Sequence, residues 1–292
     1  MKHIVLLFLL LPVYCCHAQT HQLNVATYNL RYDNADDIAQ GNGWKQRQPE
    51  IVRIIRFYGF DLFGTQEGLI HQLRQLKDSL PGFDFTGVGR DDGKEKGEHA
   101  AIFYNTSRFR LLDKGNFWLS PDTAKPEKGW DAALPRICSW GRFRELKTGF
   151  TFYCFNLHMD HIGVISRRES ARLVLEVIRK KAGTLPVILT GDFNADQQEE
   201  PYAIIQSSGL LQDAYTATDV RWAPSGTFNA FDTRRCSDNR IDHIFLSKTF
   251  RIKRYGILNN TYTSCPGAPD SSHAAVQKFP SDHFPVMAVL QY

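Results

Sequence analysis

The sequence predicts an α/β fold in which helices flank a core made of two β-sheets. Short strand-like stretches recur along the whole chain, and amphipathic helical stretches fall between them. The chain has 292 residues, of which 42% are hydrophobic and 23% charged, and it shows no repeat, low-complexity linker or break in composition. That composition is ordinary for a globular protein, and the length is within the range of large single-domain sandwiches and barrels.

The first 18 residues are predicted to be a secretory signal peptide and not part of the fold. Lys2 and His3 precede an apolar run over residues 4–14, and Cys16-His17-Ala18 supplies a small-x-small end for cleavage. Acylation of Cys16, as in a lipoprotein, is the weaker alternative because the bulky Tyr14 lies two residues before it. We therefore expect an exported protein, periplasmic or extracellular, with one domain over residues 19–292 and no transmembrane segment.

The net charge bears on the class of substrate, and the four cysteines outside residues 1–18 bear on possible disulfides. Loss of residues 1–18 removes Lys2 and no acidic residue, so the formal net charge falls from +4 to +3. This mild excess suits an anionic substrate without requiring one, and it is not the basic stripe of a duplex nuclease. Cys138 and Cys154 lie in strand-like stretches and are expected to be buried thiols. Cys236 and Cys265 lie in loops and are predicted to form a disulfide, although the sequence alone leaves the pairing open.

Nine strands are predicted from period-two alternation or from short apolar runs. The first, residues 23–31, alternates and is rich in β-forming residues, and the second, residues 60–68, is an apolar run that ends in Gly-Thr-Gln-Glu. Residues 137–143 and 151–160 are predicted to be joined through a turn at Lys147-Thr148-Gly149. The remaining strands are expected over residues 100–105, 109–120, 185–196, 241–247 and 284–291.

Three helices are predicted between these strands. The first runs from about residue 47 to 58, with Pro49 in its first turn, where proline is tolerated. The second has leucines at helical spacing, namely Leu69, Leu73, Leu76 and Leu80. The third runs from about residue 166 to 181 and has an apolar side made of Leu173, Val174, Val177 and Ile178. These apolar stripes are expected to serve only as core.

Polar residues that break the apolar pattern lie where predicted strands begin or end. They are Asn29 in TYNLR, Glu67 in GTQEG, His158 in NLHMDH, Asp192 and Asn194 in GDFN, Asp242 in IDHIF, and Asp282 with His283 in SDHFPV. Period-two alternation places Asp192 and Asn194 on one face and turns Phe193 toward the core. Neighbouring strands can end at a common rim. Carboxylates, carboxamides and imidazoles gathered there predict an oxygen-rich metal site beside proton-transferring groups.

Each of these residues alone has a plainer explanation. Asn29 can cap a strand exit, Glu67 can favour the start of the following helix through the helix dipole, and SDHFPV can be a turn before a strand. A lone histidine such as His158 is usually structural. The agreement of five strand ends with compatible chemistry favours a functional site.

The order TYNLR, GTQEG, NLHMDH, GDFN, IDHIF, SDHFPV resembles the endonuclease/exonuclease/phosphatase superfamily. This DNase I-like group includes nucleases, apurinic endonucleases, inositol polyphosphate phosphatases, sphingomyelinases and deadenylases. The resemblance covers the chain from about residue 24 to the C-terminus, and residues 88–98, 117–120 and 130–140 resemble a secreted bacterial subgroup of unknown substrate. It implies a four-layer α/β/β/α sandwich, with two mixed β-sheets flanked by helices and the active site at one rim.

The resemblance also implies a metal site. Glu67 matches the metal-binding glutamate of the family, and Asn29 and Asp282 are expected close to the same ion or to a second one. Mg²⁺, or Mn²⁺ in its place, is the expected cofactor, since Mg²⁺ prefers oxygen ligands and takes only one or two carboxylates from a protein. A zinc site would need His and Cys clustered at ligand spacing, which this sequence lacks.

The remaining motif residues match the catalytic residues of the family. Asp192 matches the residue that orients or deprotonates the attacking water, and Asn194 matches the carboxamide that holds this water and a phosphate oxygen. His283 matches the histidine that contacts the phosphoryl group, with Asp242 behind it. His158 matches a second phosphate-contacting histidine. This set implies hydrolysis of a phosphate ester by metal-assisted attack of water.

Arg136, His243 and the loop 89–99 lie beside these motifs. Arg136 is expected to bind phosphate through its fork of donors, or alternatively to pair only with a carboxylate. His243 stands where relatives commonly have Tyr, and it points away from Asp242 on the strand, so it is expected to pack. The charged, glycine-rich loop 89–99 is either a solvated loop or a contributor to the choice of leaving group.

The sequence therefore predicts an exported Mg²⁺- or Mn²⁺-dependent hydrolase of phosphodiester or phosphomonoester bonds. The substrate class stays open among a small phosphorylated molecule, a phospholipid head group and nucleic acid, and no obligatory protein partner is indicated. The alternative is a non-catalytic relative that binds phosphate ligands, which the complete set of hydrolytic residues disfavours. A purely structural exported domain would leave the carboxylates at the strand ends unexplained.

Overall fold

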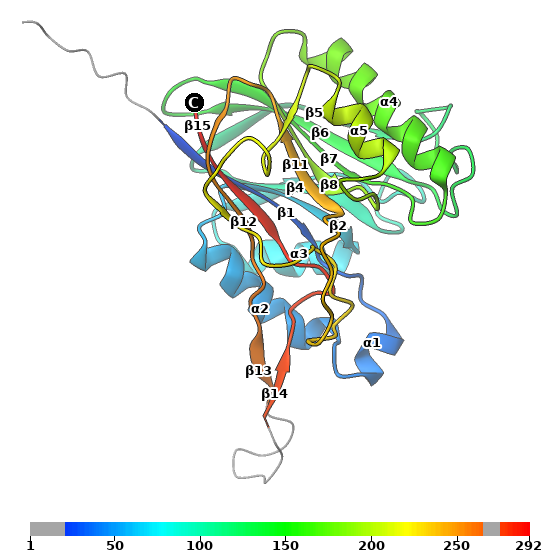
Figure 1. Cartoon of the computed structure of the whole chain (residues 1–292), viewed down its shortest axis with the longest axis vertical. Helices are drawn as coiled ribbons and strands as arrows, with labels where there is room; N and C mark the ends of the chain where they lie inside the picture. Colours follow the sequence, from blue (N-terminus) through cyan, green and yellow to red (C-terminus); the bar gives the residue numbers. More distant parts are fainter. Residues whose placement is uncertain (1–20, 265–274) are drawn as a thin grey trace, which may run out of the picture.

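Two β-sheets pack face to face in the computed structural model of this chain (Figure 1). The structure describes residues 21–264 and 275–292. The predicted signal peptide, residues 1–18, and Cys265 of the predicted disulfide lie outside the described residues, so both stay predictions.

The first sheet has seven strands and draws on both the N-terminal and the C-terminal parts of the described chain. Its strands are β1 (Gln22–Asn29), β2 (Leu62–Gly68), β3 (Phe83–Thr86), β4 (His99–Asn105), β10 (Arg221–Trp222), β12 (Arg251–Ile257) and β15 (Val286–Gln291). Their order is β10-β12-β15-β1-β2-β4-β3. The sheet is mixed, because β1 runs parallel to β2 and antiparallel to β15.

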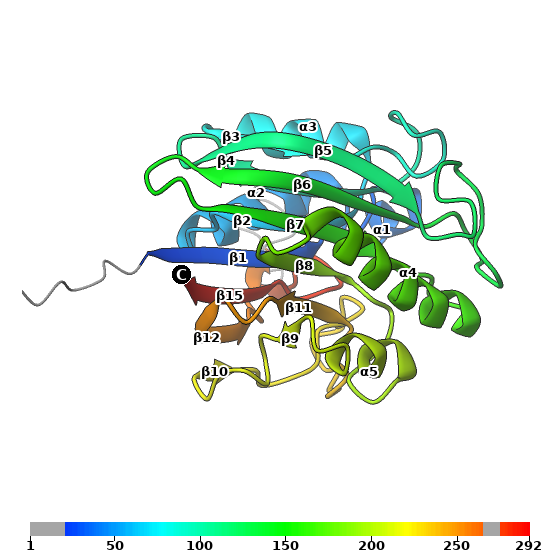
Figure 2. The same ribbon diagram turned by 90° about the horizontal axis from the view of Figure 1, so that it is seen from above.

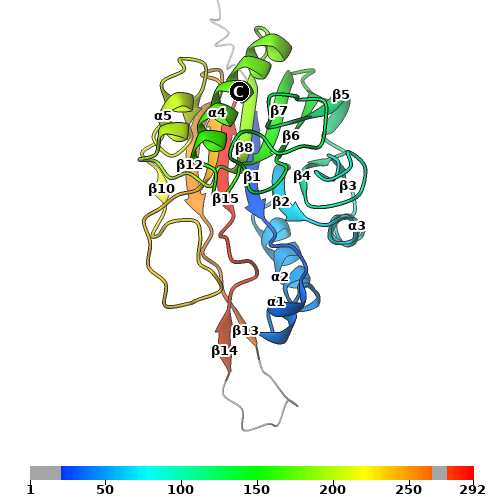
Figure 3. The same ribbon diagram turned by 90° about the vertical axis from the view of Figure 1, so that its right-hand side faces the viewer.

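The second sheet has six strands from the middle of the chain. They are β5 (Phe109–Trp118), β6 (Ile137–Glu145), β7 (Thr151–His158), β8 (Val187–Asp192), β9 (Gln212–Asp213) and β11 (Asp242–Leu246), in the order β5-β6-β7-β8-β11-β9. This sheet is also mixed, since β7 and β8 are parallel whereas β11 and β8 are antiparallel. A separate hairpin of β13 (Tyr262–Ser264) and β14 (Val276–Lys278) extends away from both sheets (Figures 1 and 3).

Helices cover the outer face of each sheet (Figure 2). α2 (Trp44–Phe57) and α3 (Ile70–Ser79) pack on the seven-stranded sheet, and α4 (Val164–Ala182) and α5 (Glu200–Gln206) pack on the six-stranded sheet. The short helix α1 (Ala35–Ala39) follows the exit of β1. Across residues 21–264 and 275–292, no helix combines the length and the apolar character that a membrane crossing requires. The predicted four-layer α/β/β/α sandwich is confirmed.

Apolar side chains fill the three interfaces between these four layers. Along β1, Val25 faces the other sheet, whereas Ala26 and Tyr28 face α2, because successive side chains of a strand point to opposite sides. On α4, Val174 and Ile178 are fully buried against the six-stranded sheet. The sandwich therefore has a core between the sheets and a further core under each pair of helices.

The structure differs from the predicted elements in several places. Leu173 and Val177 of α4 are only partly buried, because the buried stripe of this helix is centred on residues 171, 174, 175 and 178. The predicted strand 185–196 is too long: β8 ends at Asp192, and Asn194 has a left-handed backbone (φ 46°) that ends the alternation. The elements α1, α5, β3, β9, β10, β12, β13 and β14 were not predicted.

A layer of hydrogen-bonded polar residues, Gln66, Asn156 and Thr190, joins the two sheets near one rim. Asn156 of β7 accepts hydrogen bonds from Gln66 Nε2 at 2.7 Å and from Thr190 Oγ1 at 3.0 Å. Its Nδ2 donates to two main-chain carbonyl oxygens of the seven-stranded sheet, at 2.9 and 3.0 Å. Gly64 permits this approach, since a Cβ there would lie 2.1 Å from Asn156 Oδ1. Asn156 lies two residues before His158, the last residue of β7, so this layer fixes the separation of the sheets close to the rim.

Candidate active site

A pocket of about 340 Å³ opens at the rim where β1, β2, β7 and β8 end. It is lined by Arg31, Tyr32, Glu67, Glu98, Leu134, Arg136, His158, His161, Asp192, Asn194, Phe228, Asp282 and His283. Seven of the nine predicted site residues are among them. The other two, Asn29 and Asp242, lie directly behind the wall and are hydrogen-bonded to Asp192 and His283, respectively. The structure thus brings all nine together.

Strand register places three of these residues at one level. β7 and β8 run parallel and both end at the rim, where His158 is paired with Asp192. β11 runs antiparallel to β8 and begins at the rim, where Asp242 is paired with Asp192 from the other side. A buried row of imidazole and carboxylates therefore crosses three neighbouring strands of the six-stranded sheet.

Glu67 reaches the pocket because β2 is irregular at its end. Strict alternation would point Gln66 and Glu67 to opposite faces of the sheet, and Gln66 already points between the sheets. The pairing of β2 with β4 shifts between Thr65 and Gly68, and Glu67 has a φ of 62°, in the left-handed region that bulky residues seldom adopt. This bulge re-aims Glu67 into the site, which is a common place for backbone strain.

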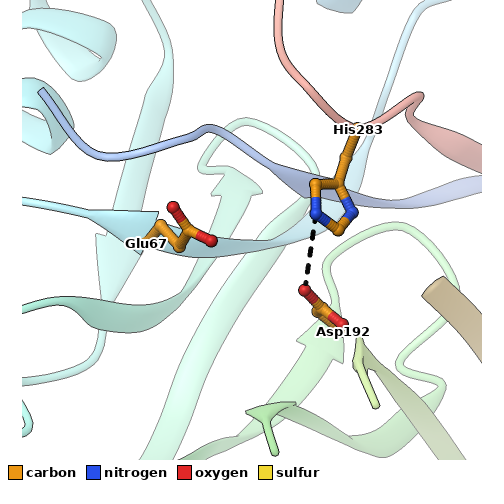
Figure 4. Close-up of side chains that lie close together, drawn as sticks. All are labelled: Glu67, Asp192 and His283. Atoms are coloured by element: carbon orange, nitrogen blue, oxygen red, sulfur yellow. Dashed lines mark ion pairs between the residues drawn. The ribbon is translucent and has the colours of Figure 1, made fainter. Parts of the chain in front are cut away.

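Glu67 and Asp192 come from different sheets and meet at the pocket with His283 beside them (Figure 4). One potential metal-ligating atom from each side chain, a carboxylate oxygen or an imidazole nitrogen, lies within 4.8 Å of the other two. Asn29 joins the carboxylates, since its Nδ2 donates to Glu67 Oε1 at 3.1 Å and to Asp192 Oδ2 at 2.9 Å. Its Oδ1 accepts from the main-chain N–H of Arg31 at 3.0 Å, which fixes the amide orientation. Asn29 is thus placed as a bridge, and its predicted role as a metal ligand stays a prediction.

Buried negative charge is crowded in this part of the pocket. Burial raises the pKa of Asp192 to about 7, and the neighbouring Asp242 adds to the rise. Burial also raises the pKa of Asp282 to about 6; His283 opposes this rise, whereas Glu67 adds to it. Oxygen donors that repel one another in a buried pocket fit a divalent cation. That Glu67 and Asp282 would hold it stays a prediction.

Without a bound cation, the protein is expected to become more stable as the pH falls from about 8 to about 6.5. Burial raises the pKa of Glu98 to about 7, and the pKa values of Asp192, Asp282 and His283 are raised as well, so the folded state binds protons that the unfolded state does not. As the pH approaches the ordinary histidine value of 6.5, His99, His158 and His243 oppose this gain, because burial lowers their pKa values.

The gain in unfolding free energy is expected to be about 1 kcal/mol, measured by urea denaturation in EDTA at both pH values. Saturating Mg²⁺ should reduce it, because a bound cation keeps the carboxylates ionised. Equal stability at the two pH values in EDTA would contradict the assignment of raised carboxylate pKa values to this pocket.

His283 is held from behind by a carboxylate. Its Nδ1 lies 2.8 Å from Asp242 Oδ2, and its Nε2 lies 3.8 Å from Asp192 Oδ2. Burial alone would lower the pKa of His283, but Asp242 and Asp192 raise it well above its ordinary value. Thr227 Oγ1 accepts from the main-chain N–H of Asp242 at 3.1 Å and keeps that residue in place. The site therefore presents an imidazolium beside the carboxylates, oriented as the sequence pattern predicts.

Arg136 organises the opposite wall of the pocket. Its Nε donates to Asp160 Oδ2 at 3.2 Å, its Nη1 to His158 Nε2 at 3.1 Å, and its Nη2 to His161 Nδ1 at 2.8 Å. Because a guanidinium only donates, His158 must carry its proton on Nδ1, which lies 3.6 Å from Glu98 Oε2. Burial and then Arg136 lower the pKa of His158 well below its ordinary value, so the ring is neutral. Arg136 thus pairs with a carboxylate and also lines the pocket, and its phosphate contact stays a prediction.

Several pocket residues were not predicted: Arg31, Tyr32, Glu98, Leu134, His161 and Phe228. Two of them had a signal in the sequence, since Arg31 belongs to TYNLR and His161 follows NLHMD. Glu98 belongs to the charged loop 89–99, and Arg90 of the same loop holds its two oxygens at 2.7 Å each. The loop therefore reaches the pocket. Phe228 packs on the ring of His283, with centroids 5.0 Å apart, and no local pattern marks it.

Two further residues lie close to the paired ends of β8 and β11. Asn194 comes two residues after the end of β8, and His243 is the second residue of β11. Asn194 lines the pocket, with its Nδ2 bonded to the carbonyl oxygen of Met159 at 3.0 Å. It reaches the pocket through its left-handed backbone and not through strand alternation. His243 packs against Phe193 with ring centroids 5.3 Å apart, as predicted, and its Nε2 lies 3.0 Å from the carbonyl oxygen of Ala195.

This chain is similar to proteins of known structure over most of its length. The model of the Endonuclease/Exonuclease/phosphatase family matches residues 26–283. A solved endonuclease/exonuclease/phosphatase family protein from Bacteroides thetaiotaomicron is 52% identical, with 94% of this chain and 96% of that chain covered and a TM-score of 0.89. A mannosyl-6-phosphatase from the same species is also 52% identical, with 92% and 100% covered and a TM-score of 0.88. The human Nocturnin catalytic domain with bound sulfate is 19% identical, with 92% and 93% covered and a TM-score of 0.66, and shares the fold.

Proposed function

Because the chain belongs to the endonuclease/exonuclease/phosphatase family, we propose that it is a metal-dependent phosphatase acting on a phosphorylated sugar. We infer the substrate class from the similarity to a mannosyl-6-phosphatase. This chain is 52% identical to that protein and covers its whole length. A pocket of about 340 Å³ accords with a small substrate, since it falls at the lower end of the range for small-molecule sites.

Asp192 is the proposed acceptor of the proton from the attacking water. It is buried at the end of β8, receives a hydrogen bond from Asn29 at 2.9 Å, and lies 3.8 Å from the charged ring of His283. That positive charge favours the ionised carboxylate, against the effect of burial. Asn194, two residues further along the chain, lines the pocket and is the residue proposed to orient the same water and a phosphate oxygen.

His283 and Arg136 are the proposed groups that stabilise the phosphoryl oxygens. Negative charge grows on these oxygens during attack, so preorganised donors accelerate the reaction more than they strengthen substrate binding. His283 is fixed by Asp242, and Arg136 by Asp160, so neither has to be reordered when the substrate arrives. Both donors line the pocket, and they precede strands of different sheets, β15 for His283 and β6 for Arg136.

The donor set also fits a divalent cation, for which we propose Mg²⁺ or Mn²⁺. Held by Glu67 and Asp282, such a cation would act as a Lewis acid that stabilises the charge on the phosphoryl group. We further propose that the domain, residues 19–292, works after export to the periplasm or the exterior, as the composition of residues 1–18 suggests.

The proposal is tested by a substrate panel assayed with Mg²⁺, with Mn²⁺ and with EDTA. The panel contains mannose 6-phosphate, glucose 6-phosphate, bis(p-nitrophenyl) phosphate, single-stranded DNA, RNA and vesicles containing sphingomyelin. The expected result is release of phosphate from a hexose phosphate with the highest kcat/KM, complete loss in EDTA, and no activity in an Asp192→Asn control. Preferential cleavage of a diester would overturn the phosphatase assignment. Turnover that persists in EDTA would overturn the metal dependence.

A further inference from the structure

Arg47 is a buried arginine that contacts two loops of the candidate active site. It lies in the first turn of α2 and is 0% exposed. The ring centroids of Trp44 and Phe231 each lie 5.5 Å from its guanidinium carbon. Arg47 does not line the pocket, and no feature of the sequence singled it out.

Every hydrogen bond of the Arg47 side chain within the described residues ends on a main-chain carbonyl oxygen. The acceptors are those of Asn42 (from Nε, 2.7 Å), Leu30 (from Nη1, 2.6 Å), Pro280 (from Nη1, 3.0 Å) and Arg31 (from Nη2, 3.0 Å). Leu30 and Arg31 directly follow Asn29, and Pro280 lies two residues before Asp282. One side chain therefore ties the exit of β1 to the loop that carries Asp282 and His283.

A guanidinium suits this position for a geometric reason. Its planar fork holds several donors at fixed angles, so it can reach carbonyl oxygens on three separate segments at once. A lysine ammonium is a compact point charge and cannot span them. Burying a charged group without a directly bonded carboxylate is costly, so the carbonyl contacts must offset that cost. Apart from Arg47, Ser281 joins the same two loops, since its Oγ donates to the carbonyl oxygen of Asn29 at 2.7 Å.

We propose that Arg47 is a positioning residue that sets the distance between the Asn29–Arg31 segment and the Asp282 loop, and thereby the affinity of the site for its divalent cation. The inference rests on the proposed function only in taking Glu67 and Asp282 as cation ligands. Residues that hold the ligands of a metal typically change its affinity by about 10- to 100-fold when they are replaced. Arg47 acts through the main chain of both loops.

The test compares Arg47→Lys with the wild-type protein. The variant is expected to need about tenfold more Mn²⁺ for half-maximal activity, with kcat at saturating Mn²⁺ within about threefold of wild type. It should also show a smaller rise in Tm when Mn²⁺ is added. Arg108→Lys is the matched control: Arg108 also donates to a main-chain carbonyl, that of Gln22, at the opposite end of β1. This control should lower the Tm of the metal-free protein and leave the Mn²⁺ requirement unchanged.

Ser281→Ala is the second variant, because it removes the Ser281–Asn29 hydrogen bond between the loops while keeping Arg47 and the Arg31–Asp282 ion pair at 3.7 Å. It should raise the Mn²⁺ requirement in the same direction. If Arg47→Lys does not fold, an unchanged Mn²⁺ requirement in Ser281→Ala would overturn the idea that the ties between these loops set the cation affinity. A lower metal-free Tm with an unchanged Mn²⁺ requirement and an unchanged Mn²⁺-induced rise in Tm would show that Arg47 is merely structural, and would overturn the proposal. The Tm measurements need no substrate, so inactivity of the wild type on sugar phosphates would count only against the proposed function.

Discussion

Replacement of His283 by alanine is expected to lower kcat on a phosphomonoester by about 100- to 10,000-fold. Asp242 holds its Nδ1 at 2.8 Å, and Asp242 with Asp192 raises its pKa well above the ordinary value in spite of burial. The contact of a charged imidazolium strengthens as negative charge grows on the phosphoryl oxygens. The loss should therefore fall on kcat and leave the cation affinity nearly unchanged. Steady-state kinetics at several Mn²⁺ concentrations measure both quantities.

Asp242→Asn is expected to cause much of the same loss, because it removes the charge that orients His283 and keeps it protonated. Since the pair acts as one unit, the double variant should be little slower than His283→Ala alone. His243→Gln is the matched control: His243 neighbours Asp242 on β11, but its ring packs against Phe193 on the other side. Losses that multiply in the double variant would show that the two residues act independently.

Glu67→Gln is expected to abolish most of the Mn²⁺-induced rise in Tm and to lower kcat/KM by at least about 100-fold. Replacing a residue that only supports a metal ligand typically costs no more than about 100-fold, so a direct ligand should cost at least that much. The substitution keeps the shape of the side chain and removes its charge. Without metal, the variant should be more stable than the wild type, because Glu67 is one of the charges that oppose ionisation of the buried Asp282. Thermal unfolding in EDTA and in Mn²⁺ measures both effects.

Glu98→Gln provides the comparison for this variant. Glu98 also lines the pocket and burial raises its pKa to about 7, but its oxygens are held by Arg90 at 2.7 Å and it lies outside the cluster of Glu67, Asp192 and His283. The Glu98→Gln protein should keep the Mn²⁺-induced rise in Tm. A Glu67→Gln protein that kept the full rise would remove Glu67 from the ligands.

The sequence predicts those parts of the site that depend on local pattern. Asp192 ends the apolar run of β8 and Asp242 opens the apolar run of β11, so antiparallel pairing of these two strands brings both residues to one rim. Alternation alone also predicts that His243 packs away from Asp242. The four-layer fold followed from the motif order, and each predicted strand has a counterpart in the two sheets.

The rest of the site depends on contacts between residues far apart in the chain. No local pattern shows that a bulge turns Glu67 into the pocket, or that the amide of Asn29 presents N–H groups to the carboxylates. The three partners of Arg136 are known only once β6 and β7 are paired. β12 was missed because a register shift between Ile252 and Arg254 interrupts its alternation. Arg47 was missed because its acceptors among the described residues are main-chain atoms, which carry no sequence signal.

The place of β15 in the first sheet affects when the enzyme becomes active during synthesis. β15 is the last described strand along the chain, yet it lies between β12 and β1. A nascent chain that already contains the whole six-stranded sheet therefore still lacks Asp282, His283 and the strand that joins β12 to the rest of its sheet. Domains fold as units once their chain is available. Hydrolytic activity should then arise in one step once β15 has been synthesised, so that nascent chains without this strand leave cellular phosphate esters intact.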